Sequence, residues 1–526
     1  MEFDQGMEKE RFFIGHDVGT GGTKSVIVSG SGEILASSFH PYETLYPSRA
    51  FAEQDPLDWW HAVCVNTTRM MDESRIDAAK ISAVGFAGQM ITILPVDAKG
   101  EHLMNAITWL DSRADEQAER MIRRLGGESV IRALAGALPS GKDIVCKLQW
   151  LKEKKPDIFA KAKYVLDSTA WLVFRATGNF VFDETAASGT GLFDIKKRQW
   201  NALLSRMTSF PVDKFPPVRK CTDTAGFLND DAALQMGLRS GIPVIAGMSD
   251  IPAAATGSGA LEDGDAHFYL GTSSWLCVSS SKPANIGRHG MVSIASPDPS
   301  MFMILGESET AGMCIEWFLR KLCLPDRGYG STLPADIYEE LDRMVDEAEP
   351  GAKGVIFTPW LFGERSPVTD TRVRASFIGL SFEHTAKHML RAIYEGVAFN
   401  LRWMIEAAEK KGFKIEALRA IGGGAKSDVW LKIVADVTKK RIEAVSNPQD
   451  AGAVGVALAA AAGVGAFSVY SQIKKAVRVR SFLEPDSSLF SLFDNLYEGF
   501  KMIYPALSKV CGALSSQNKK IERFGE

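Results

Sequence analysis

Two carboxylates in this sequence stand directly beside glycine-containing turns. Asp17 opens the segment DVGTGGTK, and Asp250 lies in GMSDIPAAATGSGA, between such a turn and a run of small residues. A carboxylate at position 17 is placed to hold a hydrated Mg²⁺, because this hard cation prefers carboxylate oxygens and water. At position 250 it is placed to cap a helix, to take a proton from a reacting hydroxyl, or to do both.

Glycines after Asp17 let the backbone turn sharply and present N–H groups to phosphate oxygens. A second Gly-Thr turn, LGTSS, occurs at residues 270–274. Two such turns that face each other across a cleft could bind a triphosphate between them. The alternative for each turn is a plain hairpin without a ligand. Lys24 could contact phosphate, or it could be a solvated lysine on a strand. We therefore predict a nucleotide site that includes Asp17, Gly19, Thr20, Gly21, Thr23, Lys24, Gly271, Thr272 and Ser273.

Three consecutive glycines follow an apolar run in ALRAIGGGAKSDVW, residues 417–430. They would let a flat adenine lie against bare backbone, and the alternative is a tight loop between a strand and a helix. The helix after them is expected to be capped near Ser427 or Asp428. The last part of the predicted nucleotide site is Gly422, Gly423, Gly424 and Ala425.

Short strands and longer helices must position these residues. Apolar runs at 12–14, 25–28 and 34–36 are separated by glycine-rich turns, which predicts antiparallel hairpins. Residues 266–280 repeat the pattern of strand, Gly-Thr turn and strand. Residues 388–408 carry apolar side chains at helical spacing. Strands alternating with helices predict an α/β fold.

Length and composition limit the class of protein. A chain of 526 residues is long enough for two domains, and the repeated hairpin places their boundary near residues 247–265. The net charge of −4 gives no support to a nucleic-acid partner. The uncharged run at 451–469 is rich in Ala and Gly, so a buried helix is expected rather than a membrane span. Seven scattered cysteines and a charged N-terminus predict a cytoplasmic protein.

Several ordered segments resemble the FGGY family of carbohydrate kinases, and its xylulokinase branch in particular. ASFIGLSFEHTAKHMLRAIYE (375–395) matches the second family signature, and KLQWLKEK (147–154) keeps part of the first. FAEQDPLDWW (51–60), ITWLDSRA (107–114) and PWLFGERSP (359–367) are similar to segments of pentulose kinases.

This resemblance implies a two-domain, actin-like ATPase (ribonuclease H-like) fold with a catalytic cleft between its domains. The domains would span residues 11–256 and 257–510. Asp17 would assist Mg-ATP through a metal-bound water, the two Gly-Thr turns would hold phosphates, and the GGG loop would receive adenosine. The resemblance makes Asp250 the catalytic base. A homodimer is common in the family.

The predicted sugar site departs from the xylulokinase pattern at two positions. Xylulokinases usually read GQMHG where this chain has GQMIT at residues 88–92, and the base is usually followed by Asn instead of Ile. A site loses selectivity for a hydroxyl when its hydrogen-bonding partner becomes aliphatic. Trp109, Asp111 and Arg113 are further candidates for the sugar pocket. The alternative for Trp109 is a buried packing residue, and the alternative for Asp111 and Arg113 is a local ion pair. The predicted substrate-binding set is Gln89, Met90, Ile91, Trp109, Asp111, Arg113, Asp250 and Ile251.

The sequence thus predicts an ATP-dependent, Mg²⁺-dependent kinase for a ketopentose or a related sugar or polyol. Because of the two aliphatic positions, a deoxy-ketose or an autoinducer-like ketose is the first alternative. The second is a nucleotide-dependent sugar sensor on the same fold that transfers no phosphate. No membrane or nucleic-acid partner is expected.

Overall fold

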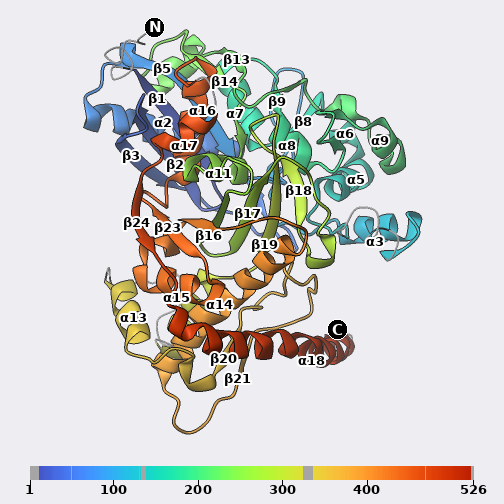
Figure 1. Cartoon of the computed structure of the whole chain (residues 1–526). Helices are drawn as coiled ribbons and strands as arrows, with labels where there is room; N and C mark the ends of the chain where they lie inside the picture. The colour runs from blue at the N-terminus through green and yellow to red at the C-terminus, as the bar shows by residue number, and fades with distance from the viewer. Residues whose placement is uncertain are drawn as a thin grey trace.

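The computed structural model describes residues 11–48, 50–128, 131, 138–323, 334, 336–467 and 470–522. Two mixed sheets dominate it, one in each half of the chain, and Figure 1 shows the first sheet above the second. In the first sheet, β1 (Phe12–Val18) pairs antiparallel with β2 (Gly22–Ser29) and parallel with β5 (Ile81–Gly88). The other strands are β3 (Ile34–Pro41), β13 (Thr224–Phe227), β14 (Pro243–Ile245) and β15 (Met248–Ser249). The predicted antiparallel arrangement of the first three strands is confirmed.

The second sheet repeats this plan. Here β16 (Ala266–Leu270) pairs antiparallel with β17 (Ser274–Ser280) and parallel with β22 (Ala417–Ile421). The remaining strands are β18 (Val292–Ala295), β19 (Phe302–Ser308), β23 (Arg441–Val445) and β24 (Val479–Leu483). In both sheets, therefore, a Gly-Thr turn follows a central strand whose neighbours are one antiparallel and one parallel strand.

Two helices of small residues pack against each other, α11 (Asp250–Ser258) and α16 (Ala451–Gly463). A Cβ added at Gly257 would lie 1.8 Å from the Ala451 carbonyl oxygen, so only glycine permits this approach. Although α16 comes late in the chain, it packs on β1 and β5, and Figure 1 shows it in red-orange beside the blue strands. Residues 451–461 of this helix are buried, as predicted for the uncharged run, but the helix ends at Gly463 and Gly465 is exposed. Residues 468 and 469 of the run lie outside the described part. No helix among the described residues is long and apolar enough to cross a membrane.

The other helices cover the two sheets. The helix predicted at 388–408 is α14 (Ala386–Glu409), and α15 (Asp428–Thr438) is capped by Ser427, whose hydroxyl accepts the Trp430 N–H at 3.0 Å. Both predictions are confirmed. Further α-helices among the described residues are, in chain order, α2 (Pro56–Ser74), α3 (Asp115–Arg124), α5 (Ile144–Lys154), α6 (Pro156–Lys161), α7 (Ser168–Thr177), α8 (Glu184–Gly189), α9 (Ala202–Thr208), α10 (Asp230–Met236), α12 (Gly312–Phe318), α13 (Ile337–Asp346), α17 (Tyr470–Ala476) and α18 (Phe490–Glu522).

Candidate functional site

Asp250 is the first residue of α11, with Ser249 at the N-cap position. The prediction that Asp250 caps this helix is therefore wrong by one residue, because Asp250 is already the first helical residue. Its Oδ1 accepts the Ile251 N–H at 2.9 Å and the Met90 N–H at 3.3 Å. Within the described ranges no group donates to Oδ2. One oxygen thus fixes the carboxylate and leaves the other available to a ligand.

Asp250 titrates close to neutral pH. Burial, together with the nearby charge of Asp17, raises the pKa of its carboxyl to about 7, although the two backbone N–H bonds oppose the shift. Glu307 on β19, from the other half of the chain, also lies close enough to raise this pKa. A carboxylate with such a pKa can accept and release a proton at physiological pH.

Asp17 lies near the end of β1, opposite Lys24 in the β1–β2 pair. Its carboxylate accepts no hydrogen bond from any described residue. Burial raises its pKa to about 6, even though the charge of Lys24 opposes the increase. The Lys24 Nζ donates to the Gln449 carbonyl at 2.9 Å. A Cβ at Gly452 of α16 would lie 2.2 Å from the Asp17 Oδ2. Glycine at position 452 therefore lets the Asp17 carboxylate pack directly against α16. A carboxylate that accepts no hydrogen bond from a described residue fits a hydrated cation.

The two Gly-Thr turns differ in how they are anchored. In the first, the Thr20 hydroxyl accepts the Trp109 indole N–H at 2.8 Å. In the second, the Gly271 and Thr272 carbonyls accept N–H groups from Gly312 and Ala311 at 2.8 and 2.9 Å, which leaves the Thr272 side chain exposed. Both turns therefore keep surface that a ligand can contact.

Tyr269 links the second turn to the two carboxylates, and sequence reasoning missed it. Its ring stacks on Trp275 with centroids 4.0 Å apart, and a Cβ at Gly271 would lie 2.3 Å from its hydroxyl oxygen. Burial, together with the nearby charges of Asp17 and Asp250, raises the pKa of Tyr269 to about 12. The structure thus brings both acids and the second turn into one region.

Two predicted nucleotide-site residues have buried side chains. Thr23 is fully buried, because β2 begins at Gly22 and the alternation of the strand turns Thr23 to the side of α2. Ala425 is also fully buried, and it lies within the short helical turn Gly423–Lys426. Neither side chain is exposed to solvent in this conformation, so only the backbone of these residues could contact a ligand, and both stay predictions.

The GGG loop is shaped mainly by packing within the protein. Gly422 has φ +91°, and a Cβ there would lie 2.4 Å from the Leu270 carbonyl oxygen. A Cβ at Gly424 would lie 2.8 Å from the Trp430 ring. Two of the three glycines are therefore required by the close approach of the loop to β16 and α15, and Gly423 alone is exposed.

Of the predicted sugar-site residues, Met90, Ile91 and Ile251 come together next to Asp250. Met90 and Ile251 belong to an apolar cluster with four buried side chains of the second half and Ala255, and Ile91 packs against its edge. The four side chains are Cys277, Ile294, Met303 and Leu305. Gln89 is buried, with its amide donating to Gln54 Oε1 at 2.8 Å and to the Gly19 carbonyl at 3.1 Å.

Ile91 adopts φ +61°, in the left-handed region. A non-glycine residue is strained there by about 1–2 kcal/mol, and a β-branched side chain is a pronounced outlier. Backbone in this conformation persists only where the surroundings hold it. The strain lies one residue from the Met90 N–H that binds Asp250.

Asp111 and Arg113 form the local ion pair that was the alternative to a ligand-binding role. Arg113 donates to both Asp111 oxygens, at 2.9 and 2.7 Å, and to Glu53 at 2.7 Å, while its guanidinium stacks on Phe51. Asp111 is fully buried and also accepts the Ala52 N–H. This pair holds the segment before and after Trp109 in place.

Trp109 is half-buried and contacts charged groups from the second half of the chain. The Arg365 guanidinium carbon lies 5.7 Å from its ring centroid, and Arg365 pairs with Glu307 and Glu309, each at 2.7 Å. Lys142 from the first half pairs with Glu309 at 3.4 Å. Sequence reasoning missed these roles, although Arg365 lies in the GERSP segment that had been singled out.

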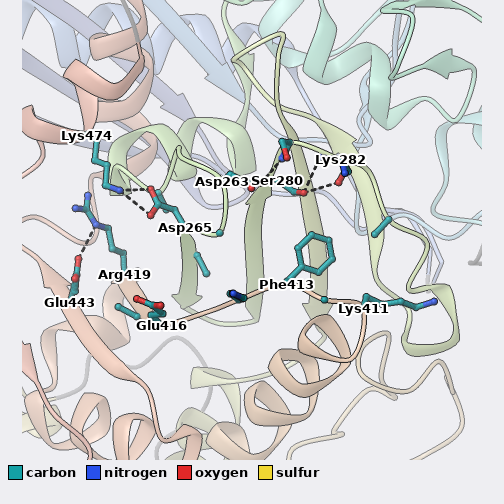
Figure 2. Close-up of a pocket in the computed structure, with 18 of the residues that line it drawn as sticks. Asp263, Asp265, Ser280, Lys282, Lys411, Phe413, Glu416, Arg419, Glu443 and Lys474 are labelled. Carbon is teal, nitrogen blue, oxygen red and sulfur yellow. Dashed lines mark hydrogen bonds and ion pairs between the residues drawn. The ribbon is translucent and has the colours of Figure 1, made fainter.

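A separate cavity of about 880 Å³ lies at the opposite ends of the same strands. It is lined by Ala266 and Ala417, where β16 and β22 begin, whereas Gly271 and Gly422 follow the strand ends. Figure 2 shows its side chains of mixed sign, with Lys474 bound to Asp265 and Arg419 to Glu443. This cavity is distinct from the region of Asp17 and Asp250.

Comparison with known proteins identifies relatives over nearly the whole chain. Residues 12–257 match the model of the N-terminal domain of the FGGY family of carbohydrate kinases, and residues 266–464 match that of its C-terminal domain. A xylulose kinase of Bacillus subtilis (strain 168) is 29% identical over 515 residues, which cover 97% of this chain and 100% of the relative. A gluconokinase of the same strain is 26% identical, covering 82% of this chain and 83% of its own.

The fold is likewise shared with solved structures. The ligand-bound xylulose kinase from Lactobacillus acidophilus superimposes with a TM-score of 0.86 at 25% identity, covering 96% of this chain and 100% of the other. These matches confirm the predicted two-domain, actin-like α/β fold.

Proposed function

Because the chain belongs to the FGGY family of carbohydrate kinases, we propose that it transfers the γ-phosphate of ATP to a hydroxyl of a ketopentose or a related sugar or polyol. The observation that carries this proposal is the environment of Asp250. One of its oxygens is fixed by two backbone N–H groups, the other accepts no hydrogen bond from a described residue, and the carboxylate lies near Asp17 and Tyr269.

In the proposed reaction Asp250 is the catalytic base. The sugar hydroxyl oxygen attacks the γ-phosphorus, its proton passes to Asp250 Oδ2, and the bond to the bridging oxygen breaks so that ADP leaves. The exposed parts of the two Gly-Thr turns and Gly423 would bind ATP. Asp17 would hold Mg²⁺ through water, and the ion would neutralise phosphate charge. We infer two domains, residues 11–256 and 257–510, and a cytoplasmic location, which the seven free cysteines support.

A less hydroxylated substrate is the second candidate for this site. Met90 and Ile251, whose backbone N–H groups bind Asp250, have their side chains in an apolar cluster, and Ile91 packs at the edge of that cluster. An apolar wall gains from contact with a methyl or methylene group and offers no partner to a hydroxyl. The site therefore favours a deoxy-ketose, or another ketose with an apolar end, over D-xylulose.

A panel of ketoses, deoxy-ketoses, polyols and gluconate, assayed by coupled ADP release with Mg-ATP, tests both candidates. We expect a higher kcat/KM for a deoxy-ketose than for D-xylulose, by about 10-fold for each methylene-sized contact. A preference for D-xylulose would overturn the apolar-substrate proposal alone. ATP binding without turnover on any member would contradict phosphate transfer to these classes.

The pKa of Asp250 predicts the pH dependence of the reaction. Only the ionised carboxylate accepts a proton, and its pKa is about 7, so kcat/KM for the sugar should fall about tenfold per pH unit below that value. The measurement is a profile from pH 5 to 9 with the preferred substrate, at fixed Mg-ATP. A profile that stays flat down to pH 5 would contradict a base with this pKa.

A further inference from the structure

Lys147 on α5 is a fully buried lysine whose charge points at two backbone segments of the site. Its Nζ donates to the Ile91 carbonyl at 2.9 Å and to the Thr108 carbonyl at 2.7 Å. Burying an ammonium group is unfavourable unless its hydrogen bonds are made, so a lysine here requires a compensating role. Lys147 is the first residue of the KLQWLKEK segment, and the sequence alone predicts no function for its side chain.

The first carbonyl belongs to the strained residue of the site. Ile91 is held at φ +61°, and the preceding residue, Met90, donates its N–H to Asp250 Oδ1. Relaxation of Ile91 to a negative φ would redirect the chain on both sides of that peptide. The bond from Lys147 stabilises the strained conformation directly, because it fixes the orientation of the Ile91 carbonyl.

The second carbonyl leads to the nucleotide side of the site. Thr108 directly precedes Trp109, whose indole N–H donates to the Thr20 hydroxyl in the first Gly-Thr turn. One ammonium group therefore connects the segment beside Asp250 with the segment beside the first turn. Asp111 and Asp143 are close enough to favour its charge, and Lys142 and Arg113 oppose it.

We propose that Lys147 is a positioning residue of the kinase reaction, which holds Ile91 in its left-handed conformation and so orients Asp250 and the apolar wall. This inference rests on the proposed role of Asp250 as the base. The proposal explains why a buried cation, Lys147, contacts a strained β-branched residue, Ile91. The strained carbonyl provides a hydrogen-bond acceptor for the lysine, and the lysine holds that carbonyl in place.

The test compares Lys147→Met with Lys214→Met. Lys214 also donates to two backbone carbonyls, those of Phe159 and Ala162, so its loss reports the structural cost of such a bridge away from Asp250. We expect kcat per folded molecule to fall by about 10²-fold for Lys147→Met, as for a misplaced reacting group, and to change less than about twofold for Lys214→Met. Crystal structures should show Ile91 at negative φ in Lys147→Met alone.

Substitution of Ile91 by glycine separates positioning from simple destabilisation. Glycine adopts positive φ without strain. The loss caused by Lys147→Met should therefore be about tenfold smaller in an Ile91→Gly background. An equal loss in both backgrounds, or Ile91 retaining φ near +61° in Lys147→Met, would overturn the proposal. Lys147→Gln, which keeps one donor, provides the same comparison if the Met variant does not fold.

Failure of this inference and failure of the proposed function give different results. Asp250→Asn, assayed in parallel, tests the base itself. If Asp250→Asn retained full activity, the base would be wrong, while the φ of Ile91 in the Lys147→Met crystal structure would still decide whether Lys147 holds that residue. If Asp250→Asn is inactive and Lys147→Met behaves like Lys214→Met, only the positioning role is excluded.

Discussion

Asp250→Asn is expected to lower kcat by about 10²- to 10⁴-fold, the range that proton transfer to a positioned base contributes. Asparagine has nearly the same shape, and its amide oxygen can still accept the N–H groups of Met90 and Ile251. What is lost is the ability of the second oxygen to accept a proton. The KM for ATP should change little, because binding of the nucleotide does not require that proton transfer. Steady-state ADP release gives both constants.

The matched control for this variant is Asp157→Asn. Asp157 is an exposed aspartate in the first turn of α6, and no role in the site is assigned to it. It should leave kcat within about twofold of the wild-type value, as surface substitutions usually leave the protein intact. Near-normal turnover of Asp250→Asn beside an intact control would remove Asp250 from the chemical step.

Ile91→His combined with Ile251→Asn is expected to change the substrate preference toward D-xylulose by about 10²-fold in kcat/KM. These are the residues that the resemblance to xylulokinases predicts at the two positions. Both replacements put hydrogen-bonding groups next to Asp250 in place of aliphatic ones, and a substrate without the matching hydroxyl leaves them unpaired. Histidine also tolerates a positive φ better than isoleucine, so position 91 should not lose its conformation.

Leu203→His with Leu234→Asn is the matched control, because these leucines are 65% and 82% exposed and lie on surface helices. The control should keep the wild-type preference. The measured quantity is the ratio of kcat/KM for D-xylulose to that for the deoxy-ketose with the highest turnover. A ratio that is unchanged in the double variant would show that residues 91 and 251 do not determine which sugar is accepted.

The positions of the main helices and strands could be predicted from local sequence patterns. The directions of single side chains could not always be predicted in this way. Glycine-rich turns between apolar runs predict both hairpins, and the Ala-Gly composition of α16 predicts its burial. By contrast, the first residue of β2 decides which way Thr23 points. A shift of one residue reverses every side chain of a strand, and turn glycines leave that start undefined.

Contacts between distant segments account for what the sequence could not predict. Tyr269, Glu307 and Lys147 reach the site only because β16, β19 and α5 pack beside segments far away in the chain. No periodicity or motif encodes such neighbours. The same holds for Gly422, whose need for glycine comes from the Leu270 carbonyl and not from a ligand.

The most direct test of the central claim measures both products of one reaction. Wild-type protein, Mg-ATP and the preferred sugar are mixed, and ADP and the sugar product are quantified together by mass spectrometry, with Asp250→Asn alongside. We predict one phosphorylated sugar for each ADP formed, and neither product above background with Asp250→Asn. ADP accompanied only by inorganic phosphate, or equal product from Asp250→Asn, would contradict a sugar kinase that uses Asp250 as its base.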